Sequence, residues 1–166
     1  MANNKIAYGS SAALTNAIEG LGSSATWVAG YESAVFDNTS DLFLDVTIEG
    51  KVTVGTGPSA ATEIRIYVVA SFDGSTWPDV FDGTTSAETV TSAGVRDGFA
   101  KLAAVLPCDS TNSDRAYPFS FSVASLFGGV VPAKFVLFVT HNTGVALNAT
   151  GSNHTFNTRG VYTTSG

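Results

Sequence analysis

The clearest hydrophobic pattern in the chain is the run from Phe135 to Val139, FVLFV, in which five consecutive residues are apolar. A strand with this composition has no face suited to water, so it belongs in the middle of a sheet that is covered on both sides. Pro132 lies just ahead of the run, where a missing N–H costs little. Asn142-Thr143-Gly144 follows as a turn, and Val145 and Leu147 are predicted to form a return strand.

The longest alternation of apolar and polar residues extends from Leu42 to Val54 and predicts a strand with one buried face. We expect the following residues to point inward: Leu42, Leu44, Val46, Ile48, Val52 and Val54. Gly50 interrupts the pattern, which indicates either a bulge or the close approach of another backbone.

Further short strands are predicted along the chain, separated by turns rich in Gly, Pro, Asp and Asn. They cover residues 25–28, 32–37, 62–72, 77–81, 99–106, 116–126 and 154–162. Eight or nine strands without a long helix predict an all-β fold, a two-sheet antiparallel β-sandwich that is jelly-roll-like. We assign residues 23–166 to this sandwich and residues 1–22 to a short N-terminal arm.

The arm contains Leu14 and Ile18 within a segment that is able to form one or two helical turns before Gly20 and Gly22. Two interpretations stay open. The arm packs loosely on its own domain, or it reaches a neighbouring subunit through Leu14 and Ile18.

Composition changes this picture mainly by what it excludes. Charged residues make up 13% of the chain, against about 25% in an ordinary soluble domain, and the net charge is −6 without a basic cluster. We therefore expect no nucleic-acid partner. The sequence starts without a secretory signal and contains no apolar run long enough for a transmembrane helix, so we expect no membrane partner and synthesis in a cytoplasm.

Candidate catalytic chemistry is sparse. His141 and His154 belong to no metal or nucleophile motif, and Cys108, the single cysteine, is expected to be a buried structural thiol. Asp79 and Asp82 would serve a glycan hydrolase only if they faced each other across a cleft, whereas Asp at loop edges ordinarily caps turns. We predict no enzyme activity and no cofactor.

The segment from Ser71 to Trp77, SFDGSTW, resembles a hairpin of discoidin-like carbohydrate-binding modules. That resemblance implies a glycan platform or a Ca²⁺ site. The candidate residues are Trp77, Asp73, Asp79 and Asp82, with Tyr31 and Tyr67 nearby. The alternative is a tight Asp-Gly turn with Trp77 packed across it.

Several segments, in their order and spacing, resemble small virion proteins of tailed bacteriophages over roughly residues 24–162. The matching elements are Asp37-Asn38-Thr39, the strand from Leu42 to Val54, Gly57-Pro58-Ser59-Ala60, the segment from Ser71 to Trp77, and PAKFVLFVTHNTGVALNATG from Pro132 to Gly151. All of these elements are turns and core strands, so the resemblance carries no catalytic residues.

The resemblance implies a structural protein of the virion, and within that class a capsid decoration (cement) protein that ties major capsid subunits together on the outside of the head. It also implies a homotrimer with the major capsid protein as partner. Two alternatives remain: a tail- or fibre-associated protein, and a carbohydrate-binding module that recognises host glycan. An exposed Trp77 would favour the glycan alternative, and a buried one would favour decoration.

Overall fold

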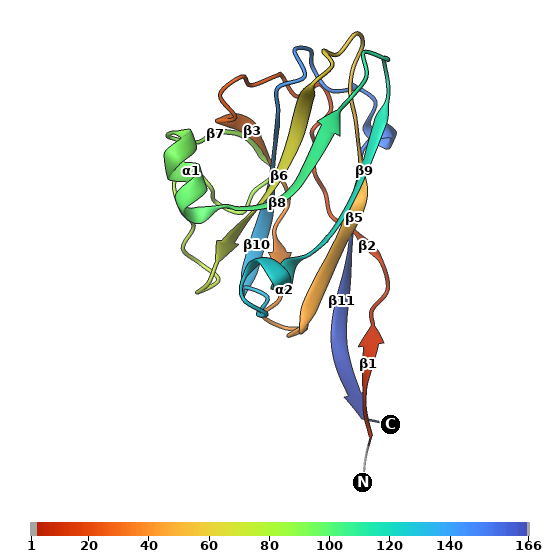
Figure 1. Cartoon of the computed structure of the whole chain (residues 1–166). Coiled ribbons are helices and arrows are strands. Elements are labelled where there is room, and N and C mark those ends of the chain that lie inside the picture. The colour runs from red at the N-terminus through yellow and green to blue at the C-terminus, as the bar shows by residue number, and fades with distance from the viewer. Residues whose placement is uncertain (1–2, 166) are drawn as a thin grey trace.

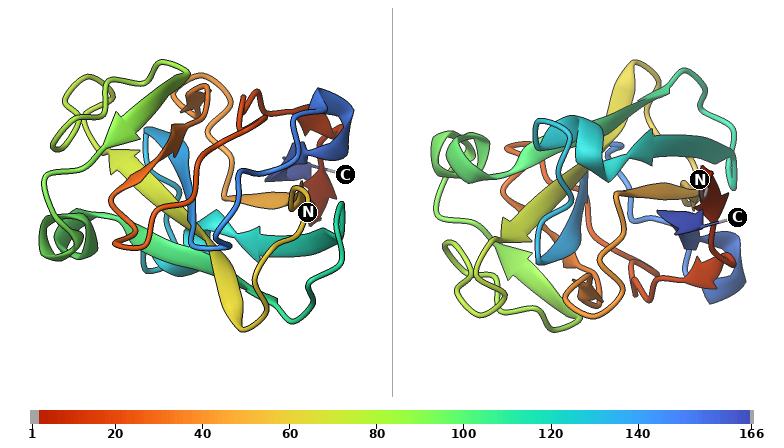
Figure 2. Two further views of the ribbon diagram at one scale, coloured as in Figure 1. Left: turned by 90° about the horizontal axis from the view of Figure 1, so that it is seen from above. Right: turned by 90° about the horizontal axis from the view of Figure 1, so that it is seen from below.

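The computed structural model describes residues 3–165 as two antiparallel sheets packed face to face (Figures 1 and 2). Sheet 1 has the order β1-β11-β5-β9, with β2 also paired to β11, and sheet 2 has the order β7-β3-β10-β6-β8, with β4 also paired to β10. The strands of sheet 1 are β1 (Asn4–Tyr8), β2 (Ala12–Ala13), β5 (Asp45–Thr53), β9 (Ala116–Ser122) and β11 (Thr155–Ser165). Those of sheet 2 are β3 (Ala29–Glu32), β4 (Phe36–Asp37), β6 (Thr62–Ser71), β7 (Ser86–Thr89), β8 (Lys101–Cys108) and β10 (Lys134–His141).

The order in which the chain connects the strands identifies the fold as a jelly roll. If β1 and β2 are counted as one broken strand, and β3 and β4 as another, the chain changes sheet at every step except along β6, β7 and β8, which all lie in sheet 2. The two four-stranded orders that result, with β7 added at one edge, are those of a jelly roll. The predicted jelly-roll-like β-sandwich is confirmed.

Strand β10 is the centre of sheet 2, between β3 and β6, as the unbroken apolar run predicted. Phe135, Leu137 and Val139 face the core between the sheets, and Val136 and Phe138 face a second hydrophobic cluster on the opposite side. This second cluster is completed by residues of the long connection from β6 to β8, so the strand is covered on both sides.

Strand β5 keeps the predicted alternation from Val46 to Val52, but it begins only at Asp45. The prediction that Leu42 and Leu44 point inward is wrong, because both side chains are exposed. Gly50 is a site of close approach: a Cβ there would lie 1.8 Å from the carbonyl oxygen of Thr155 on β11. The pairings of β5 with β11 and with β9 run past Gly50 without a shift in register, so the residue forms no bulge.

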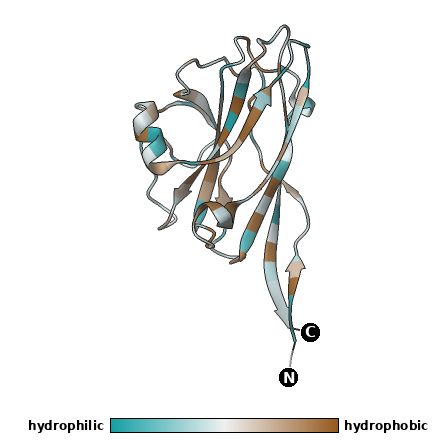
Figure 3. Ribbon diagram, viewed as in Figure 1, coloured by the Kyte–Doolittle hydropathy of each residue, from teal (hydrophilic) through white to brown (hydrophobic). Residues whose placement is uncertain are grey.

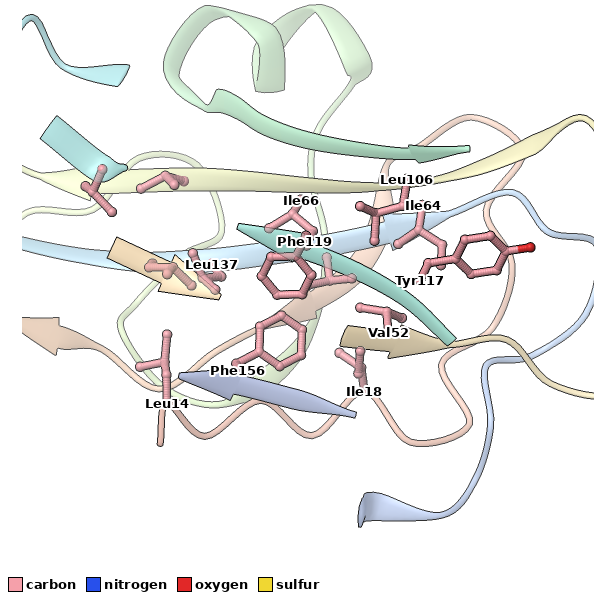
Figure 4. Packing of buried hydrophobic residues seen from close by; sticks show 14 of the residues in the cluster. Leu14, Ile18, Val52, Ile64, Ile66, Leu106, Tyr117, Phe119, Leu137 and Phe156 are labelled. Carbon is pink, nitrogen blue, oxygen red and sulfur yellow. The ribbon is translucent and has the colours of Figure 1, made fainter. Parts of the chain in front are cut away.

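The predicted helical turns of the N-terminal segment are absent; the structure has β2 at Ala12–Ala13 instead. Leu14 and Ile18 are buried in the core between the sheets, where Ile18 lies near Val52 and Leu14 near Phe156 (Figure 4). The hypothesis that these two side chains reach a neighbouring subunit is therefore wrong, because folding of the chain on itself already buries them. The boundary of the sandwich at residue 23 is also too late.

What does project from the domain is a two-stranded ribbon made of β1 and the end of β11 (Figure 1). Asn4 pairs with Ser165 at the tip, and Tyr8 pairs with Val161 at the base. Strand β5 pairs with β11 only as far as Val161, so no third strand from residues 3–165 pairs with the ribbon beyond that point.

Two short helices interrupt the strands: α1 (Ala93–Phe99) and α2 (Val123–Leu126), together with a 3₁₀ turn at Gly151–Asn153. Residues 82–97, which lie between two of the predicted strands, contain β7 and most of α1. Ser92 caps α1 by accepting a hydrogen bond from the N–H of Val95. Arg96 anchors the helix, since its buried guanidinium donates to the carbonyl of Trp27 and lies 4.6 Å from the ring of Tyr67.

Candidate binding surfaces

The three aspartates proposed for a glycan or Ca²⁺ site form no metal-ligand group among residues 3–165, because each one binds a nearby Thr: Asp73 and Asp82 cap turns, and Asp79 binds a more distant residue. Asp73 accepts hydrogen bonds from the N–H and hydroxyl of Thr76, at 2.7 and 2.6 Å. Asp82 accepts in the same way from Thr84, at 2.8 and 2.5 Å. These bonds, the side-chain bond first, hold the pKa of Asp73 and of Asp82 below the ordinary range of a carboxyl group.

Asp79 has a longer-range partner in Thr91, whose N–H and hydroxyl both donate to its carboxylate, at 2.8 and 2.6 Å. This contact fastens the loop after Trp77 to the start of α1. Among residues 3–165 no three His, Cys, Asp or Glu side chains gather as metal ligands.

Trp77 is half-buried, so its exposure separates the two functional hypotheses only partly. One face of the indole packs on Gly83, where an added Cβ would lie 3.2 Å from the ring. Trp77 also lines a groove of about 610 Å³, and four of the ten residues that line this groove are aromatic. The groove is lined by Phe72, Trp77, Phe99 and Phe127 with Asp73, Thr76 and Lys101 among its polar members.

Both histidines are structural. The ring of His141 is buried, with its nitrogens 3.0 Å from the Thr143 hydroxyl and 2.9 Å from the Leu21 carbonyl, and burial lowers its pKa. His154, at the start of β11 in the other sheet, bonds to the backbone of Thr53 and Asn148. Burial raises the pKa of the Cys108 thiol, as expected for a structural cysteine.

Sequence reasoning missed a group of exposed apolar side chains at one end of the sandwich. This apolar end consists of Leu42, Leu44, Phe72 and Val130, whose side chains are between 53% and 73% exposed. They come from three connections that meet there: β4 to β5, the segment after β6, and α2 to β10. Lys134, at the start of β10, pairs with both Asp37 and Ser71, which brings these connections to the same end (Figure 1).

Leu42 adopts an unusual backbone conformation, which the neighbouring Asn38 side chain stabilises. Its φ angle is +51°, in the left-handed region that costs a bulky residue about 1–3 kcal/mol. The buried side chain of Asn38 fixes the loop: its Oδ1 accepts from the N–H of Phe43 at 2.8 Å, and its Nδ2 donates to the Phe43 carbonyl at 3.3 Å. The loop thus holds a strained leucine with its side chain in solvent.

Two shallow hollows flank this leucine. One, of about 390 Å³, lies between the Leu42–Leu44 loop and Tyr162 at the root of the ribbon. The other, of about 270 Å³, lies between the same loop and the segment from Gly129 to Val131. Contiguous apolar patches on the surface of a protein often mark a site of contact with another molecule.

Neither helix among residues 3–165 has the length and apolar character needed to cross a membrane. Neither any protein-family model nor any curated protein matches this chain.

Proposed function

We propose that this protein is a structural component of a tailed-phage virion, a capsid decoration protein that binds the outside of the head and stabilises contacts between major capsid subunits. The observation that carries the proposal is the apolar end, where four large apolar side chains are exposed together and one of them is held at a strained φ. The proposed partner is the major capsid protein. It is chosen because the segments around Asp37-Asn38-Thr39 and after Pro132 resemble small virion proteins.

In this proposal the protein acts by binding alone, without catalysis or a cofactor. The apolar end buries area against capsid subunits, and the bound protein stabilises the assembled head by mass action. Its position would be the surface of the particle, reached after synthesis in the host cytoplasm.

The test is co-sedimentation of the purified protein with expanded, undecorated phage heads. We expect saturable binding at a stoichiometry set by the capsid lattice. Leu42→Asn should weaken this binding roughly 10-fold, because a central apolar contact is lost, while Asn tolerates the positive φ and keeps the fold. Leu102→Asn is the matched control: Leu102 is an exposed leucine on β8, outside the apolar end, and its replacement should leave binding unchanged.

A second candidate rests on the groove beside Trp77, whose aromatic walls and polar Thr76 and Lys101 suit a sugar or an apolar side chain. It would make the protein a tail- or fibre-associated receptor for host glycan. Host-cell envelopes serve as the competing target in the same assay. Binding to envelopes that is lost in Trp77→Ala, together with no binding to heads, would replace the decoration proposal with this one.

A further inference from the structure

The hollow between the Leu42–Leu44 loop and Tyr162 has one carboxylate in its lining, that of Asp41, which directly precedes the strained Leu42. Apolar and charged residues lie next to each other in this part of the chain, as the brown and teal bands around the start of β5 show (Figure 3). The other residues that line the hollow are Leu42, Phe43, Leu44, Tyr162 and Thr163. The hollow thus combines apolar walls, an aromatic ring and a single negative charge.

The carboxylate of Asp41 has no partner among residues 3–165, which distinguishes it from the other eight aspartates of the chain. Each of those accepts a hydrogen bond from within the chain, as Asp37 does from Thr39 and Asp45 does from Ser122. None of the four ion pairs in this part of the chain includes Asp41. An Asp in a loop ordinarily caps a turn, so this carboxylate is available to another molecule.

The backbone around Asp41 is fixed before any partner binds. Leu42 donates its N–H to the carbonyl of Asn38 at 3.1 Å, and the side chain of Asn38 binds the N–H and carbonyl of Phe43. Asp41 lies inside the turn that these bonds close. A group held in this way loses little conformational entropy when it binds, which favours a defined contact.

A partner that covers the apolar end also removes water from Asp41. Leu42 and Leu44 are 71% and 53% exposed, and they line the same hollow as the carboxylate. An ionised carboxylate that loses water without gaining a partner is strongly unfavourable. The covering molecule must therefore place a hydrogen-bond donor, and most favourably a positive charge, against Asp41.

The chemistry of the hollow favours a lysine or arginine side chain as this donor. Both have an apolar stem that packs on apolar surface and a charged head that binds a carboxylate. Leu42 and Leu44 would contact the stem, and the ring of Tyr162, which is 38% exposed, offers the head an aromatic face. The net charge of −6 on the chain also favours a cationic group on the partner.

We propose that this hollow is the binding site for a lysine or arginine side chain of the partner, with the charged head on Asp41 and the stem against Leu42, Leu44 and Tyr162. The inference rests on the proposed function for the identity of that partner, a major capsid subunit, and adds the chemistry of the residue that the subunit presents. It also gives the contact a dependence on salt, because ions screen a pair between charges near the surface.

The first test is co-sedimentation of Asp41→Asn with expanded, undecorated heads. The substitution removes the charge, keeps the size of the side chain and breaks no side-chain bond within residues 3–165. Binding should weaken roughly 10-fold at about 50 mM salt and only about 2-fold at about 500 mM, where the pair is screened in the wild type as well. Glu49→Gln is the matched control, since it removes the same charge from an exposed position on β5 and should leave binding unchanged. If the wild type binds heads and Asp41→Asn binds equally well at low salt, the proposal is overturned while the proposed function stands.

A second measurement tests the site in the free protein, without heads. The probe is n-butylguanidinium, which carries the stem and charged head of an arginine side chain, and the comparison is n-butylurea, which has a similar shape and no charge. Butylguanidinium should shift the backbone amide NMR signals of Leu42, Leu44 and Tyr162 much more than butylurea does, and Asp41→Asn should remove the difference. A wild type that does not bind heads would refute the proposed function, and this titration would then decide the site alone. Equal shifts with the two probes would overturn the cationic site.

Discussion

Glu32 is a fully buried carboxyl group on β3 with one unpaired oxygen, and replacing it with Gln should stabilise the protein at alkaline pH. Its Oε1 accepts the N–H of Gly83 at 2.8 Å, whereas Oε2 has no hydrogen-bond partner among residues 3–165. Burial, with smaller contributions from the charges of Asp82 and Glu88, raises the pKa of Glu32 from 4.5 to about 7. An ionised Glu32 is therefore unfavourable in the folded protein.

The sign and size of the effect follow from proton linkage. Between pH 4.5 and about 7 the folded protein binds more protons at Glu32 than the unfolded chain does, so the free energy of unfolding falls as pH rises through this interval. The pKa difference corresponds to about 3 kcal/mol, fully expressed above pH 7 and absent below 4.5. In a domain of this size that is roughly 6–12 °C in melting temperature.

The assay is urea unfolding of the wild type and of Glu32→Gln at about pH 5 and about pH 8. His141, whose pKa is lowered by burial, makes wild-type stability rise with pH up to its unfolded value of 6.5, so the total pH dependence is a sum of opposing contributions. The difference between the two proteins isolates Glu32, because His141 is common to both. It should be small at the lower pH and approach 3 kcal/mol at the higher one.

The control is Glu49→Gln, which removes the same charge from an exposed position on β5 and should change stability little at either pH. The reasoning is refuted if the advantage of Glu32→Gln is the same at both pH values, or if the Gln variant is less stable than the wild type at pH 8. Either result would mean that the ionised carboxylate is well solvated in the folded protein.

Two further substitutions test the contacts that shape the sheets and the apolar end. Gly50→Ala should destabilise the protein by at least about 3 kcal/mol in urea unfolding, because its Cβ would overlap the carbonyl of Thr155 and β5 or β11 must move; an unchanged midpoint would show that the strands separate freely. Asn38→Ala should cost about 1–3 kcal/mol and weaken binding to heads along with it, since the Phe43 backbone loses both partners; full stability would mean that the loop needs no clamp.

The parts of the fold that were predicted correctly are those in which one local pattern has one structural solution. The apolar run from Phe135 to Val139 is too short for a helix and lies between Pro132 and a Gly-containing turn, which favours a strand covered on both sides, and β10 is such a strand. The turn chemistry at Asp73 was also visible in the sequence. Asp82 also caps a turn, as expected for an Asp at the edge of a loop.

The errors arise where distant contacts decide the structure. The alternation of apolar and polar residues begins at Leu42, three residues before the chain joins sheet 1 at Asp45. The hydrogen bonds of Asn38 to Phe43 show that the backbone still turns there, and the sequence pattern does not reveal them. Ala12 and Ala13 have helical propensity, yet pairing with β11, about 145 residues later in the chain, makes them a strand. The apolar end itself combines residues from three separate connections, and no local pattern reveals that they meet.

The pairing of Asn4 with Ser165 at the ribbon tip has a mechanical consequence. A pulling force applied at these two residues acts across the first pair of the ribbon and opens the ladder from Asn4 toward Tyr8 one pair at a time, as a zipper opens. Each step breaks few hydrogen bonds, so the ribbon should yield at low force while the jelly roll stays closed behind Gly160. Force applied across the apolar end and the opposite loops would instead load many strands at once, so the same domain is weak along one direction and resistant along another.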